Sequence, residues 1–299
     1  GGNVVRSVML ACGERRAHTR GVPPLAIAAA MTSAIIHASW NAALKGGRGD
    51  RIVDAFLIAI GGMITAVALF VTMGVPAAAS WPYLATSVVI HLIYWTLLFR
   101  AYDLGDLSHI YTLSRGTAPL LVAIGAMLTA HETPPLLKAV GMVLVSIGVL
   151  CVGISPNAPV SASVWAIVLG VSIAAYSLTD ALGARLSGNP LLYVGWTSGL
   201  MGVPMVAFCF WRRGAKQLIA GSRVAPWRGI GIGILSFAGY GLVLWAQTFA
   251  PIAQVTALRE TSVVWGALIA FFVLREDLGP RRWLGAIIVA AGAILIAFA

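Results

Sequence analysis

The sequence consists of long apolar stretches separated by short polar links. A bilayer core about 30 Å thick is crossed by a helix of about 20 apolar residues. The apolar stretches are continuous and do not alternate with polar residues, which disfavours a β-barrel. We therefore predict ten transmembrane helices, over residues 24–43, 53–74, 83–102, 107–130, 135–154, 162–182, 190–211, 229–249, 251–274 and 283–299.

Composition agrees with this class, because 59% of the residues are hydrophobic and only 10% are charged. A soluble domain carries roughly 25% charged residues to cover its surface. The composition therefore excludes a soluble enzyme. The net charge of +10 lies mostly in the links and in a basic N-terminal tail, residues 1–23. Such charges orient a membrane protein and meet anionic lipid, so we expect no nucleic-acid partner.

The two halves of the chain repeat each other. A shift of 144 residues places Arg115 on Arg259 and Glu132 on Glu276, and a shift of 139 residues places Asn41 on Asp180. Five spans per repeat is an odd number, so the second repeat enters the membrane inverted, as in many secondary transporters. We predict an all-α membrane protein of two inverted five-helix repeats, residues 24–155 and 156–299, around a central cavity.

The sequence contains no metal-binding, phosphate-binding or nucleophile motif. The three cysteines, Cys12, Cys151 and Cys209, have no partner spacing and are read as small apolar residues. We predict no enzyme, no metal ion and no cofactor.

Spans one and three each carry a polar and aromatic stripe at helical spacing. An ionisable residue inside a span is costly in lipid and indicates a functional site. The alternatives are a neutral histidine bonded to a neighbouring helix and tryptophans of an interfacial belt. The stripes are His37, Trp40 and Asn41 in the first span and His91, Tyr94 and Trp95 in the third.

Two arginines, Arg115 and Arg259, occupy equivalent places in the two repeats. A guanidinium inside a span can face a substrate carboxylate or a gating carboxylate. The alternative is an ion pair that locks helices together, for example with Asp180, Asp103 or Glu260, and Glu260 offers Arg259 a local partner. Glu132 and Glu276 are read as charges at helix ends.

These residues predict a polar, partly aromatic binding site near the bilayer midplane, enclosed by both repeats. The candidate substrate-binding residues are His37, Trp40, Asn41, His91, Tyr94, Trp95, Tyr111, Arg115, Tyr176, Asp180, Tyr240, Trp245 and Arg259.

The segments HASWNAALK (37–45), AYDLGDLSHIYTLSRGTAPLL (101–121) and ALRETSVVWGALIAFFVLRED (257–277) resemble the drug/metabolite transporter superfamily, and within it the ten-span EamA-type branch. The resemblance covers about residues 24–299. It implies a basket-like helix bundle that exports small metabolites, most simply amino acids, across the bacterial inner membrane. The alternatives are a multidrug exporter of cationic compounds, a membrane scaffold and a lipid enzyme. The small multidrug relatives use a glutamate in their first span, and this chain has none there.

The orientation in the membrane stays open. The positive-inside rule favours external termini, whereas the resemblance to metabolite exporters implies cytoplasmic termini. Six cations lie on the side of the termini and eleven on the opposite side, the latter being Lys45, Arg48, Arg51, Arg212, Arg213, Lys216, Arg223, Arg228, Arg275, Arg281 and Arg282.

Overall fold

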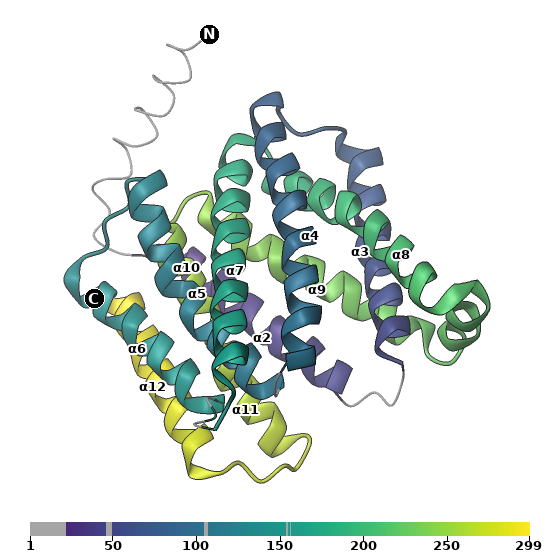
Figure 1. Ribbon diagram of the computed structural model, residues 1–299. Helices are drawn as coiled ribbons and strands as arrows, with labels where there is room; N and C mark the ends of the chain where they lie inside the picture. The colour runs from purple at the N-terminus through teal and green to yellow at the C-terminus, as the bar shows by residue number, and fades with distance from the viewer. Residues whose placement is uncertain (1–21, 46–49, 105–106, 154, 156) are drawn as a thin grey trace.

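The computed structural model describes residues 22–45, 50–104, 107–153, 155 and 157–299 (Figure 1). The described residues are helical and contain no strand. The predicted N-terminal tail lies outside them, apart from Val22 and Pro23. The first half contains α2 (Pro24–Lys45), α3 (Arg51–Met73), the short η1 (Ala78–Ser80), α4 (Trp81–Leu104), α5 (Leu107–Thr129) and α6 (Leu136–Gly153).

The second half follows the same plan with one interruption. Its helices are α7 (Val160–Leu186), α8 (Pro190–Ser222), α9 (Pro226–Gln247), α10 (Ile252–Arg259), α11 (Ser262–Phe272) and α12 (Pro280–Phe298). The ninth predicted span is therefore two helices, joined at Glu260 and Thr261. There the backbone tightens to bonds between residues three apart, for example from Val264 N–H to the carbonyl of Thr261 at 2.9 Å. Such a turn within a helix often marks a functional hinge.

The last helices of the two halves, α6 and α12, pack side by side at one edge of the bundle (Figure 1). Their glycines let the two backbones touch. A Cβ added to Gly292 would lie 2.6 Å from the carbonyl oxygen of Gly141, and one added to Gly285 would lie 2.7 Å from that of Gly148. The contacts run in opposite order along the two helices, so α6 and α12 are antiparallel.

The second helices of each half, α3 and α8, are antiparallel for the same reason. Gly195 faces Leu69 near the end of α3, while Gly221 faces Val53 near its start. Asp50 and Asn189 cap the two helices in the same way, each accepting the backbone N–H two residues on. Antiparallel mates are what an axis in the membrane plane requires.

Contacts between the halves hold the centre of the bundle. Helix α2 packs on α9, α10 and α11, and its mate α7 packs on α4 and α5. Helices α3 and α9 meet at glycines, because Gly61 lies against the Ile230 carbonyl and Gly233 against that of Ile58. The polar residues of α2, α4, α5, α7, α9 and α10 are thereby brought to one place.

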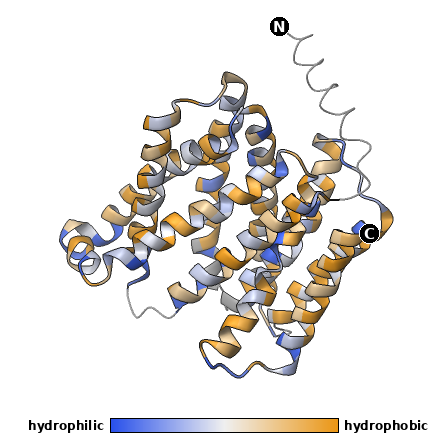
Figure 2. Cartoon of the chain, turned by 180° about the vertical axis from the view of Figure 1, so that it is seen from behind, coloured by the Kyte–Doolittle hydropathy of each residue, from blue (hydrophilic) through white to orange (hydrophobic). Residues whose placement is uncertain are grey.

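Many large apolar side chains are exposed on the bundle, and much of the ribbon in Figure 2 has the orange of hydrophobic residues. Nine candidate spans in the described part of the chain are long and apolar enough to cross a membrane, α10 and α11 counting as one. The tenth, α5, has 23 residues but carries the buried polar residues His109, Ser114 and Arg115. The predicted fold class, an all-α membrane protein of ten spans, is confirmed.

The bundle has two ends, which we call the first side and the second side. The first side is where α2 begins at Pro24, and the second side is where it ends at Lys45. Because successive spans alternate in direction, α5, α7 and α9 end on the first side, whereas α4, α8 and α11 end on the second. On the second side α8 is broken at Gly214, whose φ of 72° and ψ of 154° are not helical and suit a glycine, and a second helical stretch follows to Ser222.

Candidate functional site

A carboxylate held by hydroxyl groups lies at the centre of the second half. The side chain of Asp180, on α7, is fully buried. Tyr193 on α8 donates its hydroxyl to Oδ1 at 3.1 Å, and Tyr240 on α9 donates to Oδ2. Donors from two other helices therefore satisfy an acid that apolar surroundings alone would not tolerate.

Aromatic rings extend this centre toward α4. The imidazole of His91 stacks on the ring of Tyr176 with centroids 4.1 Å apart. Tyr94 meets Tyr176 edge-on at 5.6 Å and Trp95 at 5.7 Å. His91 Nδ1 is fixed by Ser87, at 3.0 Å from its carbonyl and 3.2 Å from its hydroxyl oxygen. The stripe of α4 is thus a wall beside Tyr176, which the shift of 139 residues places on His37.

A buried ion pair joins the two halves. Arg115 on α5 donates from Nη2 to Oε1 of Glu260 at 2.7 Å, and their side chains are only 9% and 3% exposed. Glu260 stands at the tightened turn between α10 and α11, next to Arg259 in the chain. The other oxygen of Glu260, Oε2, is buried and has no hydrogen-bond partner.

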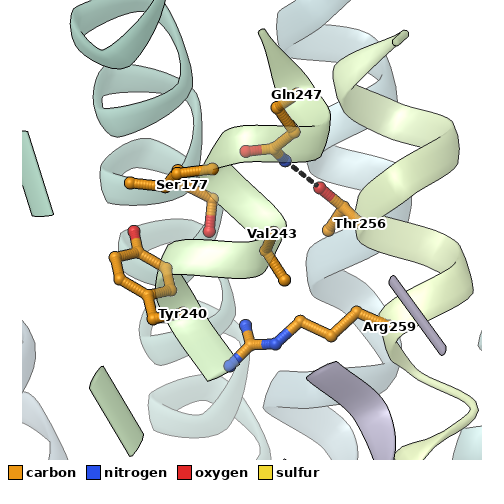
Figure 3. Close-up of a pocket in the computed structure, with 7 residues that line it drawn as sticks. Ser177, Tyr240, Val243, Gln247, Thr256 and Arg259 are labelled. Atoms are coloured by element: carbon orange, nitrogen blue, oxygen red, sulfur yellow. Dashed lines mark hydrogen bonds between the residues drawn. The ribbon is translucent and has the colours of Figure 1, made fainter. Parts of the chain in front are cut away.

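Arg259 therefore lacks the local partner that the sequence suggested. No ion pair joins it to a carboxylate within the described residues, and its Nε is buried without a hydrogen-bond partner. Its guanidinium lies 5.8 Å from the centroid of the Tyr240 ring. Figure 3 shows this side chain pointing toward Tyr240 beneath Val243. An unneutralised cation thus lies among buried groups.

Arg259 lines a cavity of about 10 Å³, which is room for one water molecule. Above it Gln247 donates to the hydroxyl of Thr256 at 3.0 Å, drawn as a dashed line in Figure 3. The Oε1 of Gln247 is buried and has no partner. The cavity is lined by Ser177, Tyr240, Val243, Leu244, Gln247, Thr256 and Arg259.

The first half contributes a more open part of the site. His37 Nε2 lies 3.4 Å from the hydroxyl of Tyr111, and its ring meets Trp40 edge-on at 5.0 Å. Tyr111 is 39% exposed, whereas Asp180 is 0% exposed. Tyr111 lies near the start of α5 and therefore toward the second side.

The structure gathers most of the candidate residues into one cluster. Trp40 and Trp95 contact this cluster through the rings of His37 and Tyr94. Two candidates stand apart. Asn41 donates to the carbonyl of His37 in its own helix at 2.7 Å, and Trp245 packs edge-on against Phe249 beside the apolar core. The cluster comprises His37, His91, Tyr94, Tyr111, Arg115, Tyr176, Asp180, Tyr240 and Arg259.

Sequence reasoning did not select several residues that complete the cluster. Glu260 was weighed as one of three ion-pair partners for the two arginines and favoured for Arg259, but the structure pairs it with Arg115. Tyr193 lies near the start of a span, where a tyrosine is typical of the membrane interface, so its spacing gave no signal. The polar residues of the cavity that were not selected are Ser177, Gln247 and Thr256.

The arrangement is that of an integral membrane protein with a buried polar site between two inverted halves. The model of the EamA-like transporter family matches residues 160–298, which is the second half. This match shows that the second half of the chain is similar to EamA-like transporters.

Among solved structures, one titled only "Crystal structure of protein" is similar to this chain, with a TM-score of 0.71 and 17% sequence identity. The alignment covers 90% of this chain and 95% of that one, so the likeness of fold extends over both halves. No curated protein matches the chain.

Proposed function

We propose that the protein is a secondary-type transporter that exports small metabolites, most simply amino acids, across the bacterial inner membrane. Substrate binds at the polar cluster, next to the cavity between α7, α9 and α10. The two inverted halves open this cluster to one side of the membrane at a time, which is alternating access.

The observation that carries the proposal is the pair of unpartnered groups at the α10–α11 turn. Arg259 has a buried Nε without an acceptor, and Glu260 has a buried Oε2 without a donor. Buried polar groups are normally satisfied, so such exceptions call for a ligand or water. An amino acid supplies both missing partners, a carboxylate for Arg259 and an ammonium group for Glu260.

The remaining surroundings suit the rest of such a substrate. The rings of His91, Tyr94 and Tyr176 provide an apolar wall for a side chain, together with polar atoms that orient it. The cavity in this conformation holds about one water molecule. The cluster must therefore open for substrate to bind. We expect it to open at Tyr111, where it is more exposed.

The charge at the site also separates amino-acid export from the multidrug alternative. A cationic drug would approach two guanidinium groups, Arg115 and Arg259, of which only Arg115 is paired with a carboxylate. Repulsion between like charges in a low-dielectric site is strong. The site therefore favours a substrate that carries an anionic group.

The test is transport by purified protein in liposomes, with a panel of labelled amino acids, purines and cationic drugs. Arg259→Gln removes the free cation and keeps hydrogen-bonding capacity, so it should lower amino-acid flux by about tenfold or more. Arg213→Gln is the matched control, because Arg213 pairs with Asp50 at the surface, 42% exposed. Flux of cationic drugs alone, unchanged in Arg259→Gln, would establish the multidrug alternative.

The aromatic wall is tested in the same liposomes with His91→Ala and Trp95→Ala, after their folding has been checked separately. Each should reduce transport of every substrate that the parent carries. Unchanged transport in both variants would remove α4 from the site. Export is tested in cells preloaded with labelled amino acid, which should lose it faster when they contain the protein.

A further inference from the structure

An ion pair on the first side of the bundle bridges the two halves. Arg185, at the end of α7, donates to Glu132, which follows α5, at 2.6 Å. Arg185 also donates to the carbonyls of Gln247 at 2.7 Å and Ala250 at 3.0 Å. Glu132 in turn accepts the backbone N–H of Ile252 at 2.7 Å. We call these two side chains and their three backbone bonds the first-side clasp.

The clasp lies over the cavity of the candidate site. Gln247, whose carbonyl accepts from Arg185, lines the cavity with its side chain. Ala250 and Ile252 form the turn from α9 into α10, which carries Arg259 at its far end. Helices α5 and α7 pack together, and they also pack on α10 and α9 respectively, so the three backbone bonds add charge-assisted ties to an existing apolar contact at this turn. While these bonds last, the α9–α10 turn cannot separate from α5 and α7.

The second side carries the repeat mate of this ion pair in a weaker form. Glu276 is the mate of Glu132, and Lys45 lies one position from the mate of Arg185. Lys45 reaches both oxygens of Glu276, at 2.7 and 2.8 Å, but the two side chains are 63% and 32% exposed. The clasp side chains are only 20% and 19% exposed. The ion pair on the first side is thus enclosed, whereas its counterpart on the second side is exposed.

We propose that Glu132 and Arg185 are the gate that closes the transport site toward the first side. This inference rests on the proposed function, since it concerns access to the same site. Charge-assisted bonds to backbone groups are stronger than neutral ones, and here they are partly shielded from water. Opening toward the first side requires the three bonds to the α9–α10 turn to break. Glu132 and Arg185 act as positioning residues and do not touch substrate.

The test measures access to the cavity and needs no substrate. Ser177 lines the cavity and is buried, so Ser177→Cys, in a background without Cys12, Cys151 and Cys209, places a thiol beneath the clasp. A membrane-impermeant thiol reagent is applied to right-side-out cells and to inside-out vesicles. Thr133→Cys, at an exposed position in the loop after α5, identifies which preparation presents the first side.

Glu132→Gln should raise the first-side labelling rate of Ser177→Cys by about tenfold, because it removes the ion pair and weakens the bond to Ile252. Glu276→Gln is the matched control and should leave that rate within about twofold, since its ion pair is exposed and distant. Arg185→Lys keeps the charge but loses the fork that reaches two carbonyls, so it should raise the rate by a smaller factor.

An unchanged rate in both Glu132→Gln and Arg185→Lys would overturn the gate, as would an equal rise in Glu276→Gln. If Glu132→Gln does not fold, Arg185→Lys decides by itself. Labelling that responds as expected in a protein that carries no amino acid in liposomes would retain the gate and reject the proposed substrate. Amino-acid flux in liposomes, together with a labelling rate that does not change in the variants, would retain the proposed substrate and reject the gate.

Discussion

Replacing Arg115 by methionine should destabilise the protein strongly, because the ion pair with Glu260 is both buried and incomplete. Arg115→Met keeps most of the side-chain volume but leaves Glu260 without the hydrogen bond to its Oε1. The Oε2 of Glu260 has no partner even in the parent. The variant would thus bury a carboxylate with neither oxygen satisfied by the protein.

The size of the effect follows from burial. The side chains are 9% and 3% exposed, so water screens the pair little. Removing one partner of a buried ion pair costs about 3–5 kcal/mol, whereas replacing both by apolar residues is often nearly neutral. We expect Arg115→Met and Glu260→Met each to lose about 3 kcal/mol, and the double variant to recover most of that loss.

The assay is thermal unfolding in detergent micelles, followed by the fluorescence of the ten tryptophans. A loss of about 3 kcal/mol corresponds to a fall in Tm of roughly 6–12 °C for a chain of this size. Arg213→Met is the control, because the Arg213–Asp50 pair is 42% and 35% exposed, and surface pairs contribute about 0–1 kcal/mol. If both single variants and the double variant unfold within a degree or two of the parent, the buried pair does not hold the halves together.

Three further predictions concern other parts of the structure. Gly292→Ala should lower Tm by overpacking the α6–α12 contact, at a cost of about 1–3 kcal/mol; Gly266→Ala, where an added Cβ meets nothing within 4 Å, should leave Tm unchanged or raise it. Tyr240→Phe should slow amino-acid transport in liposomes by about tenfold, since it removes a hydroxyl donor from Asp180 while keeping the ring beside Arg259; transport at the parent rate would show that this hydroxyl is dispensable. On the charge count, Arg51→Cys on the second side should resist impermeant reagents in intact cells while Thr133→Cys reacts, and the opposite pattern would place the termini in the cytoplasm.

The sequence predicted the helices better than their ends. Hydropathy detects where a segment is apolar, not where its hydrogen bonds stop. Beyond the predicted end at residue 211, α8 breaks at Gly214, and a separate helical stretch through the charged region, which hydropathy did not predict, reaches Ser222. The division of the ninth span at Glu260 and Thr261 was not predicted, because neither glycine nor proline marks it.

Spacing within a helix predicted which residues share a face, but not which partner they meet on another helix. Arg115 and Glu260 are 145 residues apart, and only the packing of α5 against α10 brings them together. Trp245 follows Tyr240 by five residues, which turns it about 140° around the helix. It therefore faces Phe249 and the apolar core instead of the polar cluster. The candidate site thus depends on contacts that one helix does not specify alone.

The difference between the two repeat-mate arginines has its origin in a single position. Shifted by 144 residues, Glu260 falls on Gly116, which has no side chain to pair with an arginine and packs instead against Leu150. The second half therefore supplies a carboxylate for the arginine of the first half, and the first half supplies none in return. An inverted pair with equal residues at this position would neutralise both arginines and leave nothing for an anion to bind. Because the repeats differ here, Arg115 pairs with a carboxylate of the other half, while Arg259 has no ion-pair partner among the described residues.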